Sequence, residues 1–207
     1  MYEWITYTWN TVKGECPHNC SYCYMKRRGK LNPVRFDESE LKTDLGNGNF
    51  IFVGSSCDMF AGGIPHEWIQ RTLNHCSKFD NQYLFQTKNT FRLEGNGLIF
   101  PDGSVYCTTI ETNRFYKDIM GNCPKPSDRA YHLPSASYVT IEPIIDFDLN
   151  DMVALIGLCN PIQVNIGADS GNNGLPEPPK EKILALIDAL GKFTIVKKKT
   201  NLKRLLS

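Results

Sequence analysis

Short apolar runs alternate with longer amphipathic stretches along this chain of 207 residues. The short runs are rich in β-branched and aromatic residues, and they predict strands at residues 5–9, 50–53, 83–86, 104–110, 138–141, 162–166 and 193–196. Helical spacing is found instead at residues 65–76, 149–158 and 180–190. This alternation indicates the α/β class with a mostly parallel sheet.

The remaining stretches have weaker patterns. Residues 21–28 have helical character, residues 30–49 are polar and predict a connection, and turn signals interrupt residues 91–103. Residues 113–134 predict a long irregular segment. The chain is expected to form one domain over residues 1–207. The chain has only six or seven strand–helix units, and its length falls short of the roughly 250 residues typical of a complete eight-unit barrel.

Polar side chains stand at the ends of five predicted strands: Asp58, Lys88, Glu111, Glu142 and Asp169. In β/α folds the carboxyl ends of the strands form one rim, and ligands bind there. We therefore expect these five side chains to gather at one site.

Alternation along the strands extends this polar surface inward. If Glu111 points into the inner face of the sheet, Thr109 and Cys107 share that face, and Thr140 shares it with Glu142. Buried polar groups need hydrogen-bond partners. The sequence thus predicts an inner face that is filled by water or by a polar ligand.

The net charge of +1, from 23 basic and 22 acidic residues, does not indicate a partner. The distribution is uneven, because five Lys and Arg residues lie within residues 26–35 and six lie within residues 192–204. Such clusters either bind phosphates or form a solvated basic rim. No run approaches membrane-spanning length, and no secretory signal pattern is present, so the chain is expected to be cytoplasmic with no membrane partner.

Three cysteines lie within eight residues, at Cys16, Cys20 and Cys23, with the spacing C-x3-C-x2-C. A closed zinc site takes four protein ligands and an ordinary 4Fe-4S cluster takes four cysteines, so three cysteines leave one metal position open. Zinc with His18 or a remote cysteine as its fourth ligand is the alternative. The other five cysteines stand alone, and no second cluster is expected; they are Cys57, Cys76, Cys107, Cys123 and Cys159.

With Tyr22 before its last cysteine, this motif resembles the signature of radical S-adenosylmethionine (SAM) enzymes. The whole chain is similar to small phage and bacterial radical SAM proteins of unassigned function, which are distantly similar to spore photoproduct lyase. The resemblance implies an open partial (β/α)6-type barrel in which Cys16, Cys20 and Cys23 bind a 4Fe-4S cluster. SAM would bind the fourth iron and be cleaved reductively to a 5'-deoxyadenosyl radical.

The resemblance also implies roles for residues beyond the motif. Ser55, Ser56 and Asp58 lie where the family binds the amino group of SAM, although the usual Gly-Gly-Glu segment is replaced here. Lys88 stands where related proteins place a lysine for the SAM carboxylate, a contact that suits a compact ammonium charge.

Three further residues are candidates for the ribose or the substrate: Thr109, Glu111 and Glu142. The alternative for each carboxylate is an ion pair with Lys198 or Arg114. Cys107 is the candidate catalytic thiol that returns hydrogen to a substrate radical, and its alternative role is that of a small buried apolar residue.

Two classes of function follow from the sequence. The first is a radical SAM enzyme that uses a one-electron reductant such as flavodoxin or ferredoxin, in the host cytoplasm if the chain is phage-encoded. Its substrate is expected to be a nucleobase, a nucleotide, a nucleic acid or another small molecule, ahead of a peptide. The second is a non-catalytic zinc-binding adaptor for nucleic acid or protein.

Overall fold

The computed structural model of the chain describes residues 2–94 and 97–207 and contains a seven-stranded sheet. The spatial order of the strands is β1 (Tyr7–Trp9), β4 (Phe50–Val53), β5 (Gln82–Gln86), β6 (Ser104–Thr109), β7 (Tyr138–Ile141), β8 (Gln163–Ile166) and β9 (Ile195–Lys198). Every neighbouring pair is parallel. The predicted α/β class and parallel sheet are confirmed, and β1 and β9 form the two edges of an open sheet.

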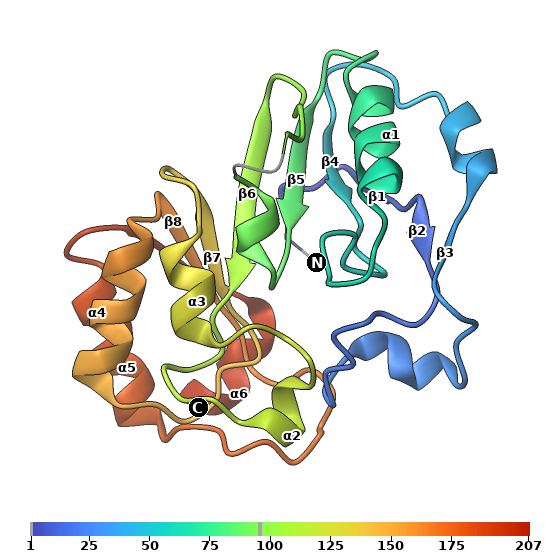
Figure 1. Cartoon of the computed structure of the whole chain (residues 1–207). Coiled ribbons are helices and arrows are strands. Elements are labelled where there is room, and N and C mark those ends of the chain that lie inside the picture. Colours follow the sequence, from blue (N-terminus) through green and yellow to red (C-terminus); the bar gives the residue numbers. More distant parts are fainter. Residues whose placement is uncertain (1, 95–96) are drawn as a thin grey trace.

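Three long helices connect strands of this sheet: α1 (His66–Cys76), α4 (Leu149–Cys159) and α5 (Lys180–Leu190). Figure 1 shows α1 beside the first strands and α4 and α5 together beside the last strands. Three short helices complete the set: α2 (Lys117–Met120), α3 (Pro126–Tyr131) and α6 (Lys203–Leu206). No helix within the described residues is long and apolar enough to cross a membrane.

Two stretches contain more structure than their sequences predict. Residues 113–134, expected to be irregular, form α2 and α3, which are too short to show a helical repeat. Residues 30–49, expected to be a connection, contain β3 (Arg35–Phe36), which pairs antiparallel with β2 (Val12–Lys13). They also contain a 3-10 helix, η2 (Glu38–Lys42).

Other 3-10 turns form in segments whose sequence patterns are weak. Residues 21–28 form only the turn η1 (Tyr24–Arg28), and residues 91–103 include the end of η3 (Thr90–Arg92). The turn η4 (Thr200–Leu202) precedes α6. These segments lack a long apolar face, so tertiary contacts rather than periodicity determine their conformation.

The two faces of the sheet have different surroundings. Ile51, Val53 and Phe85 belong to the main hydrophobic core, together with the buried apolar residues of the long helices. Leu84 and Cys107 belong instead to a second, smaller core on the inner face. Strand alternation accounts for this division.

The N-terminal segment fills one end of the inner face. Tyr2 stacks on Trp4, with 4.8 Å between ring centroids, and Trp4 lies 4.7 Å from the Phe50 ring and 5.6 Å from the Tyr138 ring. The prediction of a polar inner face is therefore wrong at this end, because residues that precede the first strand close it with aromatic rings. The carboxyl end of the strands stays polar, and Gln163 at the start of β8 donates to Asn165 Oδ1 at 2.9 Å.

Candidate functional site

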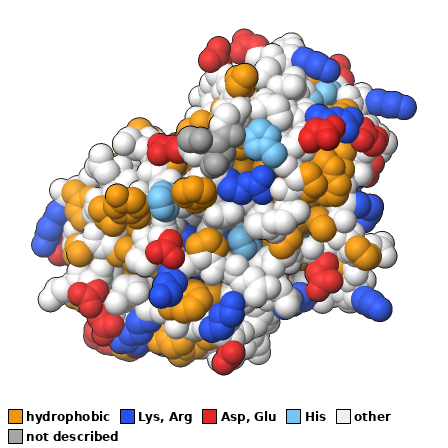
Figure 2. Space-filling view, viewed as in Figure 1, with side chains coloured by type: hydrophobic (Ala, Val, Ile, Leu, Met, Phe, Trp, Pro, Cys, Tyr) orange, Lys and Arg blue, Asp and Glu red, His pale blue; other side chains and the backbone are white. Residues whose placement is uncertain are grey.

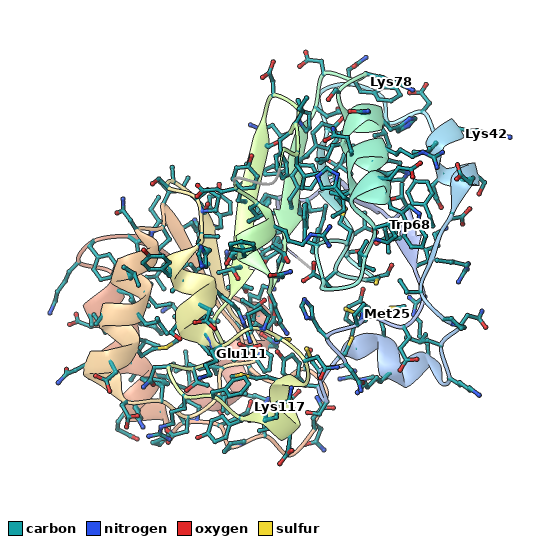
Figure 3. All side chains as sticks on the ribbon, viewed as in Figure 1. Met25, Lys42, Trp68, Lys78, Glu111 and Lys117 are labelled. Carbon is teal, nitrogen blue, oxygen red and sulfur yellow. The ribbon has the colours of Figure 1, made fainter. Side chains whose placement is uncertain are left out.

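The cysteine motif lies over the carboxyl ends of the strands. In Figure 1 the strand arrows point toward η1 and α2, the two elements that flank this end of the molecule. Cys16, Cys20 and Cys23 line one cavity there. Seven of the other lining residues were predicted to be at the site: Ser55, Ser56, Asp58, Lys88, Thr109, Glu142 and Asp169. In Figure 3, Glu111 and Met25 mark the two sides of this region, near the end of β6 and on η1.

The turn after α2 holds the motif loop in place. The amide of Asn122 donates to the carbonyl of His18 at 2.7 Å, and the amide of Ser21 donates to the carbonyl of Ile119 at 2.9 Å. Gly121 has φ +66°, and a Cβ there would lie 2.2 Å from the His18 carbonyl oxygen. Only glycine fits such a close approach of two backbones.

Asp58 fixes the same loop from the sheet side. Its carboxylate accepts hydrogen bonds from the Thr87 hydroxyl and the Lys88 amide, each at 2.9 Å, and from the Phe60 amide at 3.0 Å. His18 Nε2 lies 2.9 Å from Oδ2 of Asp58. Burial alone would raise the pKa of Asp58. The His18 ring and these hydrogen bonds lower it by more than burial raises it, so the pKa lies below its usual value. Asp58 thus holds the cysteine loop through its contact with His18.

Lys88 lies at the centre of a buried charge network. Its ammonium is 3.3 Å from Cys20 Sγ and 3.2 Å from Oε1 of Glu111, and it also contacts the Tyr22 hydroxyl. Tyr22 donates to the same Glu111 oxygen, whose partner oxygen lies 2.7 Å from Nη1 of Arg129. The side chains of Glu111 and Arg129 are 0% exposed. Two cations thus share one carboxylate, and the network leaves a positive charge beside Cys20.

Glu111 therefore lies in an ion-pair network, as one alternative required, but the predicted partners are wrong. Burial raises its pKa, while Arg129 and Lys88 lower it more, to about 2. Arg114 pairs with Asp146 and Asp148 at 2.7 Å instead. Sequence reasoning missed Arg129 because it lies in the segment that was expected to be irregular.

Glu142 reaches the cavity from the end of β7. One carboxylate oxygen pairs with Lys199, and the other accepts from Asn201 Nδ2 at 2.8 Å. Its partner is thus Lys199 rather than the predicted Lys198. A Cβ on Gly167 would lie 2.7 Å from the Glu142 carboxylate, so the next strand end has no room for a side chain.

Ser55 and Ser56 follow β4, where Gly54 has φ +79°. Asn10 holds both serines, because its Oδ1 accepts from the Ser56 amide at 2.8 Å and from the Ser56 and Ser55 hydroxyls at 2.9 and 3.3 Å. The Tyr24 hydroxyl donates to the Ser55 carbonyl at 2.9 Å. The segment is therefore rigidly placed on the cavity wall.

Two cysteines that stand alone in the sequence lie beside the motif in the fold. Cys123 Sγ is 3.4 Å from Cys20 Sγ, and Cys57 is hydrogen-bonded to Cys16. All eight cysteines are free thiols. The sequence does not predict these two contacts, because spacing along the chain does not indicate which loops meet in the fold.

The acidity of the motif thiols differs. A hydrogen bond from Cys123 and the charge of Lys88 outweigh burial and lower the pKa of Cys20 to about 5. A hydrogen bond from Cys57 lowers the pKa of Cys16 to about 7, whereas burial raises the pKa of Cys23. Thiolates are the forms that bind metal.

The donor set fits an iron-sulfur cluster in kind, because three free cysteine thiols share one cavity with a buried lysine. Within the described residues, no group of three His, Cys, Asp or Glu side chains is close enough to hold a single metal ion.

Cys107 faces the inner side of the sheet, as predicted, but is fully buried there. Its Sγ lies 3.8 Å from the Tyr2 hydroxyl, which donates to Gln86 Oε1 at 2.8 Å. Gln86 in turn donates to the Thr109 hydroxyl at 3.1 Å. Burial raises the pKa of Cys107 to about 12, so it keeps its proton at neutral pH.

No protein-family model matches the chain, and comparisons with curated proteins and with solved structures find no match either.

Proposed function

We propose that this chain is a radical SAM enzyme, related to the small phage and bacterial proteins that its cysteine motif resembles. The observation that supports this best is the shared cavity of Cys16, Cys20 and Cys23 at the carboxyl ends of an open parallel sheet. We interpret the sheet as the wall of an open partial (β/α)6-type barrel. When bound, a 4Fe-4S cluster with SAM supplies a 5'-deoxyadenosyl radical that abstracts hydrogen from the substrate.

The residues around the cavity have complementary tasks in this proposal. Lys88 binds the SAM carboxylate, and its fixed ammonium provides the charge for it. The Ser55–Ser56 segment offers backbone and hydroxyl oxygens for the amino group, while Thr109 and Glu142 accept the ribose hydroxyls. Glu111 is a positioning residue, because its carboxylate contacts the Lys88 ammonium and holds it in place.

Cys107 is the thiol that we propose as hydrogen donor. Since it is fully buried, the hydrogen passes through the Tyr2 hydroxyl: Tyr2 O–H reduces the substrate radical, and Cys107 S–H restores Tyr2. An electron from the one-electron reductant, such as flavodoxin or ferredoxin, and a proton from solvent then restore the thiol. The Cys107→Ser variant should keep its iron but divert the substrate radical to side products, whereas unchanged product would remove Cys107 from the reaction.

Iron content tests the assignment of the three ligands. Anaerobically reconstituted protein should hold about four irons per chain, as one cluster does. Serine variants of Cys16, Cys20 or Cys23 should each lose most of this iron. The matched control is Cys159→Ser, because Cys159 is a buried thiol within α4. Zinc in place of iron, or full iron loading in Cys20→Ser, would contradict the assignment.

A further inference from the structure

A second groove adjoins the cysteine cavity and shares part of its wall. Both are lined by Tyr24, Phe52, Ser55, Ser56, Gln86, Glu142 and Ser170. From this shared wall the groove continues toward η1 and the β2–β3 ribbon, where Arg28, Lys30 and Arg35 line it. A molecule in the groove can therefore reach from the cysteine cavity to these three basic side chains.

The charged residues that line the groove are five cations and one carboxylate, Glu142. Two of the cations are neutralised within the protein: Lys199 pairs with Glu142, and Lys13 pairs with the carboxylates of Asp37 and Glu40. The three that remain are at the outer end of the groove.

Arg28, Lys30 and Arg35 are exposed, and none has a carboxylate partner among the ion pairs of residues 2–94 and 97–207. They concentrate three positive charges at one place in a chain whose net charge is only +1. On the face that Figure 2 presents, lysine and arginine side chains are dispersed among acidic and uncharged ones. The groove thus has a local positive charge that favours the binding of an anion.

The backbone holds these cations in fixed positions. Arg28 is the last residue of η1. Arg35 lies opposite Lys13 in the backbone register of the antiparallel strands β2 and β3. Gly14 follows this ribbon with φ +105°, and a Cβ there would lie 2.5 Å from the Pro33 carbonyl oxygen. The segment that carries Lys30 and Arg35 is therefore folded tightly back on the start of the cysteine loop.

Aromatic rings line the inner part of the groove. Tyr24 is 49% exposed, and its hydroxyl is held by Ser55, so its ring has a fixed position on the wall. Phe52 also lines the groove, whereas Tyr2 is buried there with its ring packed against Trp4 and Lys199. An inner aromatic wall and an outer cluster of cations are complementary to a planar base at one end and a phosphate at the other.

We propose that the substrate of this site is a nucleotide, free or within a single-stranded nucleic acid. Its phosphate binds Arg28, Lys30 and Arg35, and its base and sugar lie against Tyr24 and Phe52, next to the cysteine cavity. This assignment rests on the proposed function, since it is the cysteine cavity that makes the bound nucleotide a substrate.

Binding of a fluorescein-labelled single-stranded oligonucleotide to reconstituted full-length protein tests the proposal. The triple variant R28A/K30A/R35A should weaken binding at least tenfold, whereas the matched control K42A/K78A/K180A removes three exposed charges elsewhere and should change it less than twofold. The slope of log K against log salt should fall by about 0.7 in the first variant, because the three cations bind one phosphate and each phosphate contact on a single strand contributes about 0.7. Equal losses in the two variants would overturn the proposal.

Competition identifies the source of the phosphate. Displacement of the probe by a mononucleotide, but not by its nucleoside, supports a free nucleotide, and displacement by oligonucleotides alone supports a nucleic acid. Inorganic phosphate that competes as well as the mononucleotide would overturn the nucleotide assignment, because the aromatic part of the groove would then contribute nothing.

Two measurements distinguish a failure of the nucleotide assignment from a failure of the proposed function. Salt dependence of the unmodified protein needs no variant to fold, and a slope near zero would overturn the phosphate contacts on its own. Iron content is determined in the same preparation. Missing iron would count against the proposed function, whereas missing oligonucleotide binding with full iron loading would count against the nucleotide alone.

Discussion

At the scale of single residues, the site depends on how one buried lysine is held. Lys88 lies against Cys20, and Tyr22 and Glu111 fix its ammonium from the other side. A buried ammonium is stable only when charged and polar partners surround it. These contacts place a positive charge beside the Cys20 thiol.

Replacement of Lys88 by alanine should weaken SAM binding. A charge-assisted contact contributes roughly 1.5–3 kcal/mol and an exposed pair about 0–1 kcal/mol, so the dissociation constant should rise by about tenfold or more. Lys78→Ala is the control, because Lys78 is exposed and lies far from Glu111 in Figure 3. Equal SAM affinities in isothermal titration of both variants would remove Lys88 from the site.

Glu111→Gln should destabilise the fold, because Arg129 and Lys88 would lose their shared counter-charge. Breaking a buried pair from one side costs about 3–5 kcal/mol in unfolding free energy. Because the folded pKa of Glu111 is lowered to about 2, its contribution is present above its unfolded value and is lost as pH falls toward 2. Urea unfolding should show the difference between native and variant shrinking below about pH 4.5. A difference that does not change down to pH 3 would contradict this charge assignment.

At the scale of elements, a short segment that follows the sheet positions the motif. The turn after α2 binds the cysteine loop through backbone hydrogen bonds, and Cys123 and Arg129 follow in the same segment. The loop is thus clamped between this segment and the strand ends, where Asp58 holds His18.

Gly121→Ala tests this clamp. A Cβ would collide with the His18 carbonyl oxygen, so the cysteine loop must move and the variant should retain less than half of the native iron. Gly174→Ala is a close control, because Gly174 has φ +67°, against +66° for Gly121, but has open space for a Cβ. An alanine at either position carries the strain of a positive φ. Equal iron loss in both would show that the strain, and not the contact, is responsible.

The elements that the sequence predicts correctly are those with a strong pattern. Apolar runs identify the seven strands, and the cysteine spacing identifies the centre of the site. The contribution of α2, α3 and the β2–β3 ribbon is not predictable in this way, because two to six residues cannot show a period. Arg129 and Cys123 are missed for this reason, and so is the aromatic closure by Tyr2 and Trp4, which precede the first strand.

At the scale of the whole molecule, the open sheet has one closed and one accessible end. Aromatic rings of the N-terminal segment fill the inner face at one end, and the cysteine cavity and the basic groove occupy the other. The candidate site therefore lies at the carboxyl ends of the strands, where ligands bind in other β/α folds.

Formation of 5'-deoxyadenosine from SAM tests the central claim most directly. Reconstituted protein, reduced with dithionite under anaerobic conditions, should form 5'-deoxyadenosine and methionine in equal amounts, measured by liquid chromatography. A variant with serine at Cys16, Cys20 and Cys23 should form neither. The account would be contradicted if protein with about four irons per chain left SAM intact, or if the triple variant cleaved it equally well.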